Sequence, residues 1–264
     1  MEPSSLARST RAAAGAIKVA IRGVSKSFVR KHDELCVLEG IDLDVRDGEL
    51  VCILGASGCG KSTLLNIVGG FETPTAGSVQ IDGVDVTAPD ARRVFVFQEY
   101  GIFPWASVWD NVALGLHDKP KAEQARIVQH YVDLVGLKGF EKSYPAELSG
   151  GMRQRVAVAR AFAVSPDVVF MDEPLGALDS LTRLQMRAEI LRLWRTEELT
   201  ILFVTHDVDE SIQLADRIVV LTPRPGRIAE ILPVDLAHPR DIGSAEYARI
   251  KKRLYELLGV VHAI

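Results

Sequence analysis

Cysteine is scarce in this sequence, and long apolar runs are missing. Among the 264 residues there are three cysteines, Cys36, Cys52 and Cys59, and no two of them are spaced as a CxxC pair. Neither a zinc site nor a disulfide framework is therefore indicated, and a reducing, cytosolic compartment fits. Apolar stretches such as residues 201–204 and 218–221 fall far short of the roughly 20 residues that span a bilayer. We expect that the chain does not cross a membrane by itself.

A strong charge of one sign is also absent. The 31 basic and 35 acidic side chains give a formal net charge of −4, which argues against a dedicated nucleic-acid binder. With 47% hydrophobic and 25% charged residues, the composition is that of a globular protein with one large core, or a core and a small subdomain. Residues 1–16 are rich in Ser, Ala and Arg but lack the apolar segment of a secretory signal, so they are predicted to form a disordered tail.

The apolar pattern places a helical block between two regions that contain strands. Short β-type runs dominate residues 17–83, whereas the periodicity is helical from about residue 110 to 164. Strands alternate with helices from residue 168 onward, which predicts a parallel sheet with helices on both faces. Strands are predicted at residues 19–21, 37–45, 50–54, 78–81, 94–97, 168–171, 200–204 and 218–221, and helices at 121–135, 180–195, 208–214 and 244–258.

Residues 55–62 read Gly-Ala-Ser-Gly-Cys-Gly-Lys-Ser, a full match to the GxxxxGK[ST] phosphate-binding loop. The loop lies between the apolar runs 50–54 and 64–68, which is the strand, loop and helix context that the motif requires. Glycines let backbone N–H groups close around phosphate oxygens, Lys61 supplies a mobile charge, and the Ser62 hydroxyl can bind Mg²⁺. The alternatives are an ordinary glycine-rich turn and, for Cys59, a redox-sensitive thiol in place of a small tolerated loop residue. The predicted phosphate contacts are Gly55, Ala56, Ser57, Gly58, Cys59, Gly60, Lys61, Ser62 and Thr63.

Two carboxylates stand at the end of another predicted strand. Residues 168–173 read Val-Val-Phe-Met-Asp-Glu, so this strand delivers Asp172 and Glu173 at its carboxyl end, where ligands sit in open α/β sheets. Asp172 is placed to hold Mg²⁺, directly or through water, and Glu173 to polarise a water for attack on a γ-phosphate. Carboxylates in this place often only cap the following helix, but a phosphate loop in the same chain favours the catalytic interpretation.

A second glycine pair opens a predicted helix, in the segment Leu-Ser-Gly-Gly-Met-Arg-Gln at residues 148–154. Ser149 can be a simple N-cap, since serine is common before a helix. Gly150 and Gly151 leave backbone N–H groups bare at the positive end of the helix, which would make a second phosphate cradle in one chain. One chain rarely needs two such cradles.

The phosphate loop, the segment 148–154 and the strand that ends in Asp172 and Glu173 occur in an order that resembles the ATP-binding cassette (ABC) ATPases. The helical block lies between these motifs. The resemblance covers residues 17–233. It implies an α/β fold of the P-loop NTPase (RecA-like) type, with a parallel-sheet core, an antiparallel β subdomain and an inserted α-helical subdomain. The domains implied are an ATPase domain at 17–234, its helical subdomain at about 98–164 and a C-terminal helical tail at 235–264.

Membership of that family would make the chain half of a head-to-tail homodimer that binds ATP and Mg²⁺. In such a dimer, Ser149, Gly150 and Gly151 of one subunit contact the γ-phosphate that the other subunit's loop holds. The family implies roles for four further residues, and for three of them, Gln98, Asp179 and Phe28, the alternative is ordinary surface polarity or core packing. The four residues are Gln98, at Mg²⁺ and the attacking water, Asp179, in the loop 177–179 that crosses the dimer interface, His206, the switch histidine at the γ-phosphate, and Phe28, which stacks on adenine.

The segment 98–116 is unusually aromatic, with Tyr100, Phe103, Trp105 and Trp109 close together. Exposed, these side chains would be interface anchors, and buried, they would be the core of the helical block. Composition leaves both open. In ABC ATPases this region receives a cytoplasmic helix of the membrane-spanning subunit, so a permease is expected to contact the segment around Glu99–Trp109.

Two segments, Glu-Tyr-Gly-Ile-Phe-Pro-Trp at 99–105 and Pro-Arg-Pro-Gly-Arg-Ile at 223–228, resemble those of the importer ATPases for nitrate, aliphatic sulfonates and taurine. The resemblance implies that the chain hydrolyses ATP, with Glu173, His206, Gln98 and Lys61 as catalytic residues. It also implies a peripheral location on the cytoplasmic face of the inner membrane, permease subunits, an indirect link to a substrate-binding protein, and no nucleic acid. The alternatives are a non-transport ABC ATPase and a regulatory subunit that binds nucleotide without hydrolysing it. The transported substrate stays open.

Overall fold

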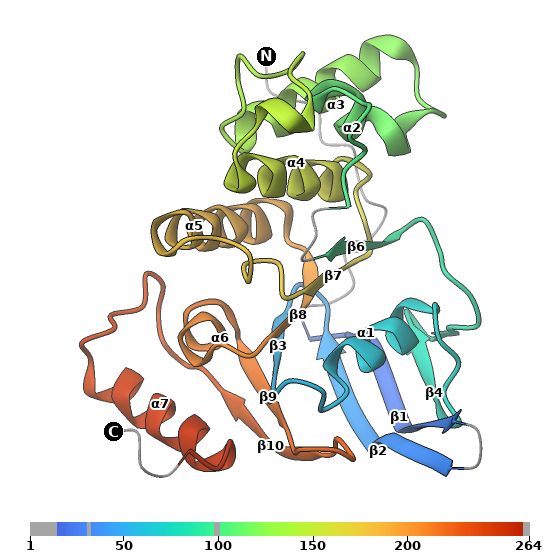
Figure 1. The fold of residues 1–264 in the computed structure, drawn as a ribbon, viewed down its shortest axis with the longest axis vertical. Helices are drawn as coiled ribbons and strands as arrows, with labels where there is room; N and C mark the ends of the chain where they lie inside the picture. The colour runs from blue at the N-terminus through green and yellow to red at the C-terminus, as the bar shows by residue number, and fades with distance from the viewer. Residues whose placement is uncertain (1–14, 31–32, 98–100, 261–264) are drawn as a thin grey trace.

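The computed structural model describes residues 15–30, 33–97 and 101–260 and is organised around a six-stranded sheet (Figure 1). The strand order is β10-β9-β3-β8-β7-β6, and every neighbouring pair is parallel except β10 and β9. The strands are β3 (Leu50–Leu54), β6 (Arg93–Phe97), β7 (Val168–Asp172), β8 (Thr200–Thr205), β9 (Arg217–Leu221) and β10 (Ile228–Pro233).

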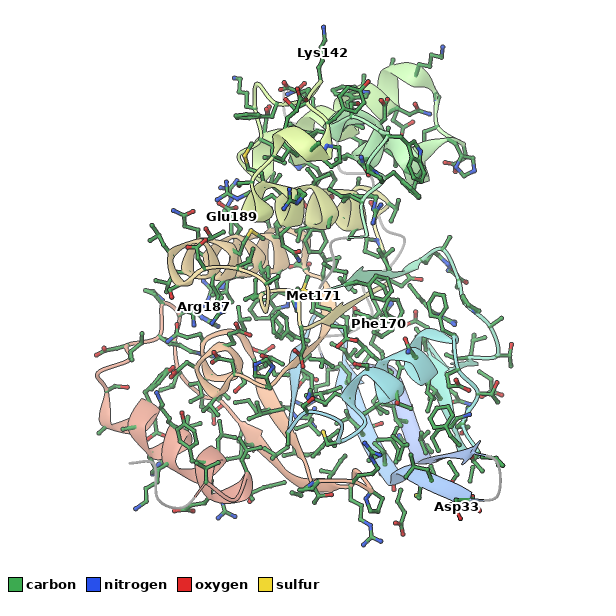
Figure 2. The ribbon with its side chains drawn as sticks, viewed as in Figure 1. Asp33, Lys142, Phe170, Met171, Arg187 and Glu189 are labelled. Carbon is green, nitrogen blue, oxygen red and sulfur yellow. The ribbon has the colours of Figure 1, made fainter. Side chains whose placement is uncertain are left out.

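The central strands are apolar on both faces because both faces of the sheet are covered. Every residue of β3 and β8 is buried. Successive side chains of a strand point to opposite faces, so the neighbours Phe170 and Met171 of β7 enter different cores (Figure 2). Met171 packs in the larger core with the helical block, and Phe170 packs in the smaller core with α1 (Lys61–Gly69).

A four-stranded antiparallel sheet covers the other side of α1 and completes the smaller core. Its order is β2-β1-β4-β5. Side chains from β1, β2 and β4 join those of α1 and the large sheet in one buried cluster. The strands are β1 (Ile17–Arg30), β2 (Asp33–Arg46), β4 (Ala76–Ile81) and β5 (Val84–Asp85).

The helical block forms the upper part of the molecule in Figure 1, and α5 lies between it and the lower part. The C-terminal helix α7 packs on α6 at the opposite end. The block consists of α2 (Val108–Ala113), η1 (Leu114–Leu116), α3 (Lys121–Leu134), η2 (Pro145–Glu147) and α4 (Gly150–Ala163). The other helices are α5 (Ser180–Glu197), α6 (Val208–Leu214) and α7 (Ala245–Leu257).

The predicted fold class is confirmed, and two features of the sheets differ from expectation. The strands β1 and β2 each have 14 residues, far more than the predicted runs 19–21 and 37–45, because polar residues of their exposed faces interrupt the apolar pattern. The strand β10 was not predicted, since it is an edge strand without a fully buried residue. The domain boundaries stay a prediction, and most of the tail at 1–16 lies outside the described residues. In the part of the chain that the structure describes, no helix has the length and apolarity of a membrane span.

Candidate functional site

The loop 55–60 connects β3 to α1 and takes a shape that needs glycine. Gly60, the N-cap of α1, has φ 107°, which is the left-handed region. A Cβ at Gly60 would also lie 2.7 Å from Leu38 Cδ2, so backbone conformation and space both demand glycine. No side chain caps this helix end. An uncapped helix end of this kind leaves backbone N–H groups that a ligand can satisfy.

Lys61 lies within the loop that it is predicted to serve. Its side chain is 4% exposed, and Nζ donates to the backbone oxygens of Gly55 at 2.9 Å and Ala56 at 3.0 Å. The Glu173 carboxylate stands 3.7 Å from the same ammonium. A buried ammonium needs such oxygen partners, and a phosphate oxygen can take the place of one of them. The sequence prediction for Lys61 fits this geometry.

Cys59 is enclosed by the structure. The side chain is 1% exposed, and burial raises the pKa of the thiol, although Lys61 opposes that effect. A protonated, enclosed thiol is a poor nucleophile. These observations favour the small tolerated loop residue over the redox-sensitive thiol.

Asp172 and Ser62 form an oxygen pair suited to Mg²⁺. Burial raises the pKa of the Asp172 carboxyl, and a hydrogen bond with the Ser62 side chain acts in the opposite direction. No group of three His, Cys, Asp or Glu side chains among the described residues could hold a metal ion. This set fits Mg²⁺, which prefers hard oxygen ligands and is usually held by one or two side chains together with phosphate oxygens and water.

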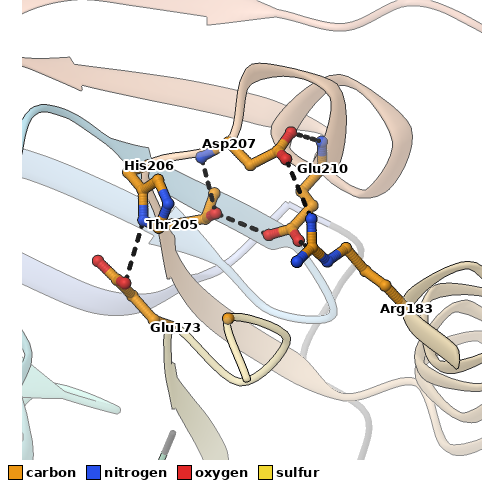
Figure 3. Close-up of a pocket in the computed structure, with 7 residues that line it drawn as sticks. Glu173, Arg183, Thr205, His206, Asp207 and Glu210 are labelled. Carbon is orange, nitrogen blue, oxygen red and sulfur yellow. Dashed lines mark hydrogen bonds and ion pairs between the residues drawn. The ribbon is translucent and has the colours of Figure 1, made fainter. Parts of the chain in front are cut away.

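Glu173 and His206 meet directly, although 33 positions separate them (Figure 3). His206 Nδ1 lies 3.0 Å from Glu173 Oε2. The backbone at Glu173 has φ 46°, an uncommon left-handed conformation for this residue type that costs energy. One carboxylate thus faces the ammonium of Lys61 and the imidazole of His206.

Sheet order explains this meeting. The parallel strands β3, β8 and β7 are neighbours, with Leu54 opposite Thr205 and Asp172 opposite Val204. Their carboxyl ends therefore share one edge, from which the phosphate loop, His206 and Glu173 continue.

Five further residues, which were not predicted as site residues, line a pocket next to Glu173 and His206. Glu173, Gly176 and His206 line it together with Arg183, Thr205, Asp207 and Glu210 (Figure 3). The spacing Asp-x-x-Glu before a helix is a capping signature that points to Asp207 and Glu210. No sequence pattern links Arg183 to them, because it belongs to α5.

The second glycine pair is not brought to the phosphate loop of the same chain. The segment 149–151 opens α4 in the helical block, apart from α1 in Figure 1. The Ser149 hydroxyl accepts a hydrogen bond from the Met152 N–H at 3.2 Å, so Ser149 is an N-cap. Gly151 faces Thr182 of α5, whose Cγ2 would lie 2.3 Å from a Cβ at this position. The described chain therefore contains two separate glycine-rich helix ends.

Three other predicted residues have different outcomes. Asp179 is the exposed N-cap of α5 and accepts from the N–H groups of Leu181 and Thr182. A hydrogen bond with the Thr182 side chain, and then these N–H groups, lower the pKa of its carboxyl. Phe28 is half-buried against the smaller core, and Lys26 Nζ lies 4.9 Å from its ring centroid. Their family roles stay predictions. Gln98, Glu99 and Tyr100 lie outside the described residues.

The aromatic segment is divided between surface and core. Trp105 is 74% exposed and lies against Phe103, with ring centroids 5.2 Å apart, whereas Trp109 packs on the larger core. The neighbouring loop holds the exposed side chains of Phe140 and Tyr144. Neither alternative therefore describes the whole segment.

Comparisons with known proteins agree with the motifs. The family model described as ABC transporter matches residues 38–176. The chain is 46% identical over 244 residues to the uncharacterized ABC transporter ATP-binding protein MJ0412 of Methanocaldococcus jannaschii, covering 92% of this chain and 91% of that one. It is 43% identical over 240 residues to the aliphatic sulfonates import ATP-binding protein SsuB of Bacillus subtilis, covering 90% and 92%. A dimeric post-hydrolysis structure of the ATP-binding cassette MJ0796 with ADP and Pi is similar with a TM-score of 0.72 at 30% identity, covering 82% and 98%.

Proposed function

This chain belongs to the ABC transporter family, and we propose from that premise that it is the ATPase subunit of an importer for a small anion, such as a sulfonate, nitrate or taurine. It is an ATPase that uses ATP and Mg²⁺. The single observation that carries the assignment of its catalytic residues is the meeting of Lys61, Glu173 and His206 at one edge of the sheet.

We assign the phosphate contacts to residues 55–63 and the Mg²⁺ ligands to Ser62, Asp172 and Gln98. The free N–H end of α1 and the enclosed Lys61 ammonium support the first assignment. The Ser62–Asp172 hydrogen bond supports the second. Mg²⁺, when bound, neutralises negative charge that builds up on phosphate oxygens.

Glu173 acts as the general base in this proposal. Its carboxylate accepts a proton from the attacking water, and His206 holds the carboxylate through the contact at 3.0 Å. Lys61 stabilises the negative charge that develops on the phosphoryl oxygens. The left-handed backbone at Glu173 is consistent with a functional role, because strained backbone conformations are common at active sites.

The proposed assembly is a homodimer in which each phosphate loop faces the α4 end of the other copy. Ser149 and Asp179 are exposed and take no part in the site of their own chain. Leu181 and Leu184 beside Asp179 are 67% and 51% exposed, and exposed apolar side chains of this kind are typical of an interface.

The proposed permease contact includes Trp105, Phe140 and Tyr144, which are 74%, 42% and 49% exposed. Exposed aromatic side chains that lie close together are common anchors of protein interfaces. This contact would hold the chain peripherally at the cytoplasmic face of the inner membrane, with a substrate-binding protein linked through the permease.

The variant Glu173→Gln tests the proposal. It removes the base but keeps the size of the side chain, so hydrolysis should fall by about 10²- to 10⁴-fold while ATP stays bound. Phosphate release and equilibrium ATP binding are measured on the same preparation. Wild-type turnover in Glu173→Gln would contradict the assignment of the site.

The importer part of the proposal needs a separate experiment. The chain is reconstituted in liposomes with candidate permease and binding-protein subunits from the same organism, and uptake of a labelled sulfonate, nitrate and taurine is compared. ATP-dependent uptake of one of them is expected. Transport in the outward direction, or hydrolysis that the permease does not affect, would contradict import.

A further inference from the structure

Arg183 of α5 joins two segments that carry predicted site residues. Its Nη2 donates to the backbone oxygen of Leu178 at 3.0 Å, directly before Asp179. On its other side, Nη1 lies 3.9 Å from Asp207 Oδ2 and Nε lies 3.6 Å from Glu210 Oε1 (Figure 3). One guanidinium thus links the turn before α5 to the two carboxylates that follow His206.

Both chain neighbours of His206 belong to the cluster that Arg183 contacts. The Thr205 hydroxyl donates to Glu210 Oε2 at 2.7 Å and accepts from the Asp207 N–H at 3.0 Å. Asp207 Oδ1 in turn accepts from the Glu210 N–H at 2.9 Å. Since these bonds fix the backbone on either side of His206, they also fix the point from which its imidazole reaches Glu173.

Arg183 is the cation that faces the two carboxylates of this cluster. Glu210 is 4% exposed, and burial and the nearby Asp207 both raise the pKa of its carboxyl. The hydrogen bond from the Thr205 hydroxyl opposes this shift most, followed by Arg183 and Arg187, and Arg183 is the cation within ion-pair distance of both carboxylates. Without Arg183, two like charges would stand together in a mostly buried place, which is unfavourable.

We propose that Arg183 is a positioning residue for hydrolysis, which holds the His206 imidazole against Glu173 through Asp207 and Glu210. Arg183 acts through these neighbours and, among the described residues, forms no hydrogen bond or ion pair with Glu173 or Lys61. The inference rests on the proposed function, because it presumes that the Glu173–His206 pair is catalytic. A plain stabilising ion pair would also use these contacts, so the test has to separate the two roles.

The first measurement compares Arg183→Met with Arg192→Met. Arg192 lies on the same helix, is exposed, and forms no ion pair with any described residue. Arg183→Met should lower kcat by roughly 10- to 100-fold, as expected for a displaced catalytic group, with little change in ATP affinity. Arg192→Met should match the wild type. Wild-type kcat in Arg183→Met, with hydrolysis lost in His206→Ala, would overturn the inference and leave the proposed function intact.

The second measurement is a double-mutant cycle with His206→Ala. If Arg183 acts through His206, the double variant should be no slower than His206→Ala alone. Independent effects that multiply would show a merely structural role and overturn the inference. Wild-type turnover in both His206→Ala and Glu173→Gln would instead overturn the proposed site.

A charge-conserving variant covers the case in which Arg183→Met does not fold. Arg183→Lys keeps a cation facing Asp207 and Glu210, so it should recover at least about half of the wild-type kcat if charge is what positions the loop. Circular dichroism melting and ATP binding confirm that each variant is folded. A folded Arg183→Lys with kcat as low as His206→Ala would overturn the charge argument.

Discussion

Two glycine-rich helix ends in this chain look alike in sequence and differ in structure. At α1, Gly60 is the N-cap in a left-handed conformation, and no side chain caps the N–H groups. At α4, the Ser149 hydroxyl caps the Met152 N–H, and Thr182 occupies the space beside Gly151. The first end has no side-chain cap, whereas the second is capped by Ser149 and packed against Thr182 of its own chain.

The difference supports the proposal that the two ends supply different halves of one site. The α1 end has a cation, a Ser62–Asp172 pair and Glu173 close by, all from one chain. The α4 end has an exposed serine, and no described contact connects it to those groups. A complete site therefore requires a second copy in our proposal, and three experiments test this comparison.

The largest effect is expected from mixing two variants that each lower hydrolysis on their own. Lys61→Met should abolish hydrolysis by removing the phosphate contact, and Ser149→Ala should impair it by altering the facing end. In a mixed dimer, one site combines the Lys61→Met loop with the Ser149→Ala end, and the other site contains neither substitution. An equal mixture should regain roughly a quarter of wild-type activity, because half of its dimers would hold one intact site of two.

Phosphate release from the separate and mixed variants measures this recovery. Each variant mixed with the wild type serves as the control for subunit exchange. No recovery in a mixture whose subunits exchange would show that the two ends do not belong to one shared site.

Substituting alanine for Gly60 or for Gly151 should destabilise the fold for two different reasons. Gly60→Ala places a side chain at φ 107° and 2.7 Å from Leu38 Cδ2, so it should destabilise the fold by about 1–3 kcal/mol and no single neighbour can relieve it. Gly151→Ala clashes with Thr182 Cγ2 at 2.3 Å, so Thr182→Ser in the same chain should restore stability. Chemical denaturation measures both.

Hydrolysis by the Gly151→Ala, Thr182→Ser double variant sharpens the result. Restored stability without restored hydrolysis would show that Gly151 also serves the facing phosphate. Failure of Thr182→Ser to restore stability would contradict the packing reason for Gly151.

The smallest effect is expected from pH. Burial raises the pKa of Asp172 above its ordinary value of 3.8, and a protonated carboxyl cannot bind Mg²⁺. As the solution is acidified, Mg²⁺-dependent ATP binding should therefore weaken at a higher pH than an ordinary aspartate would cause. The α4 end should add no such pH dependence, because the Ser149 hydroxyl does not ionise in the acidic range. Mg²⁺ titration at several pH values measures the effect, and equal pH dependence in Asp172→Asn would contradict it.

Residues that act through local backbone could be predicted from the sequence. The phosphate loop, the N-cap at Ser149 and the helix α6 at Val208–Leu214 depend on neighbours within a few positions, and their spacing is visible in the sequence. The resemblance added His206 and Phe28, which no local pattern singles out.

Contacts between distant elements could not be predicted in this way. Arg183 reaches Asp207 and Glu210 only because α5 passes the start of α6, and helix periodicity carries no information about that approach. Trp105 and Trp109 have the same composition and opposite surroundings, since the backbone turns between them. The edge strand β10 is held by pairing with β9 and has little apolar pattern.

The sequence by itself determined that this protein folds as an ABC-type ATPase and where its phosphate loop lies, because glycine spacing and strand ends are local properties. Only the tertiary structure decided that Lys61, Glu173 and His206 share one edge of the sheet, since the order β3-β8-β7 brings together strands that are far apart in the chain. It also separated the α4 end from that edge, because the helical block packs as a layer of its own beyond α5 (Figure 1).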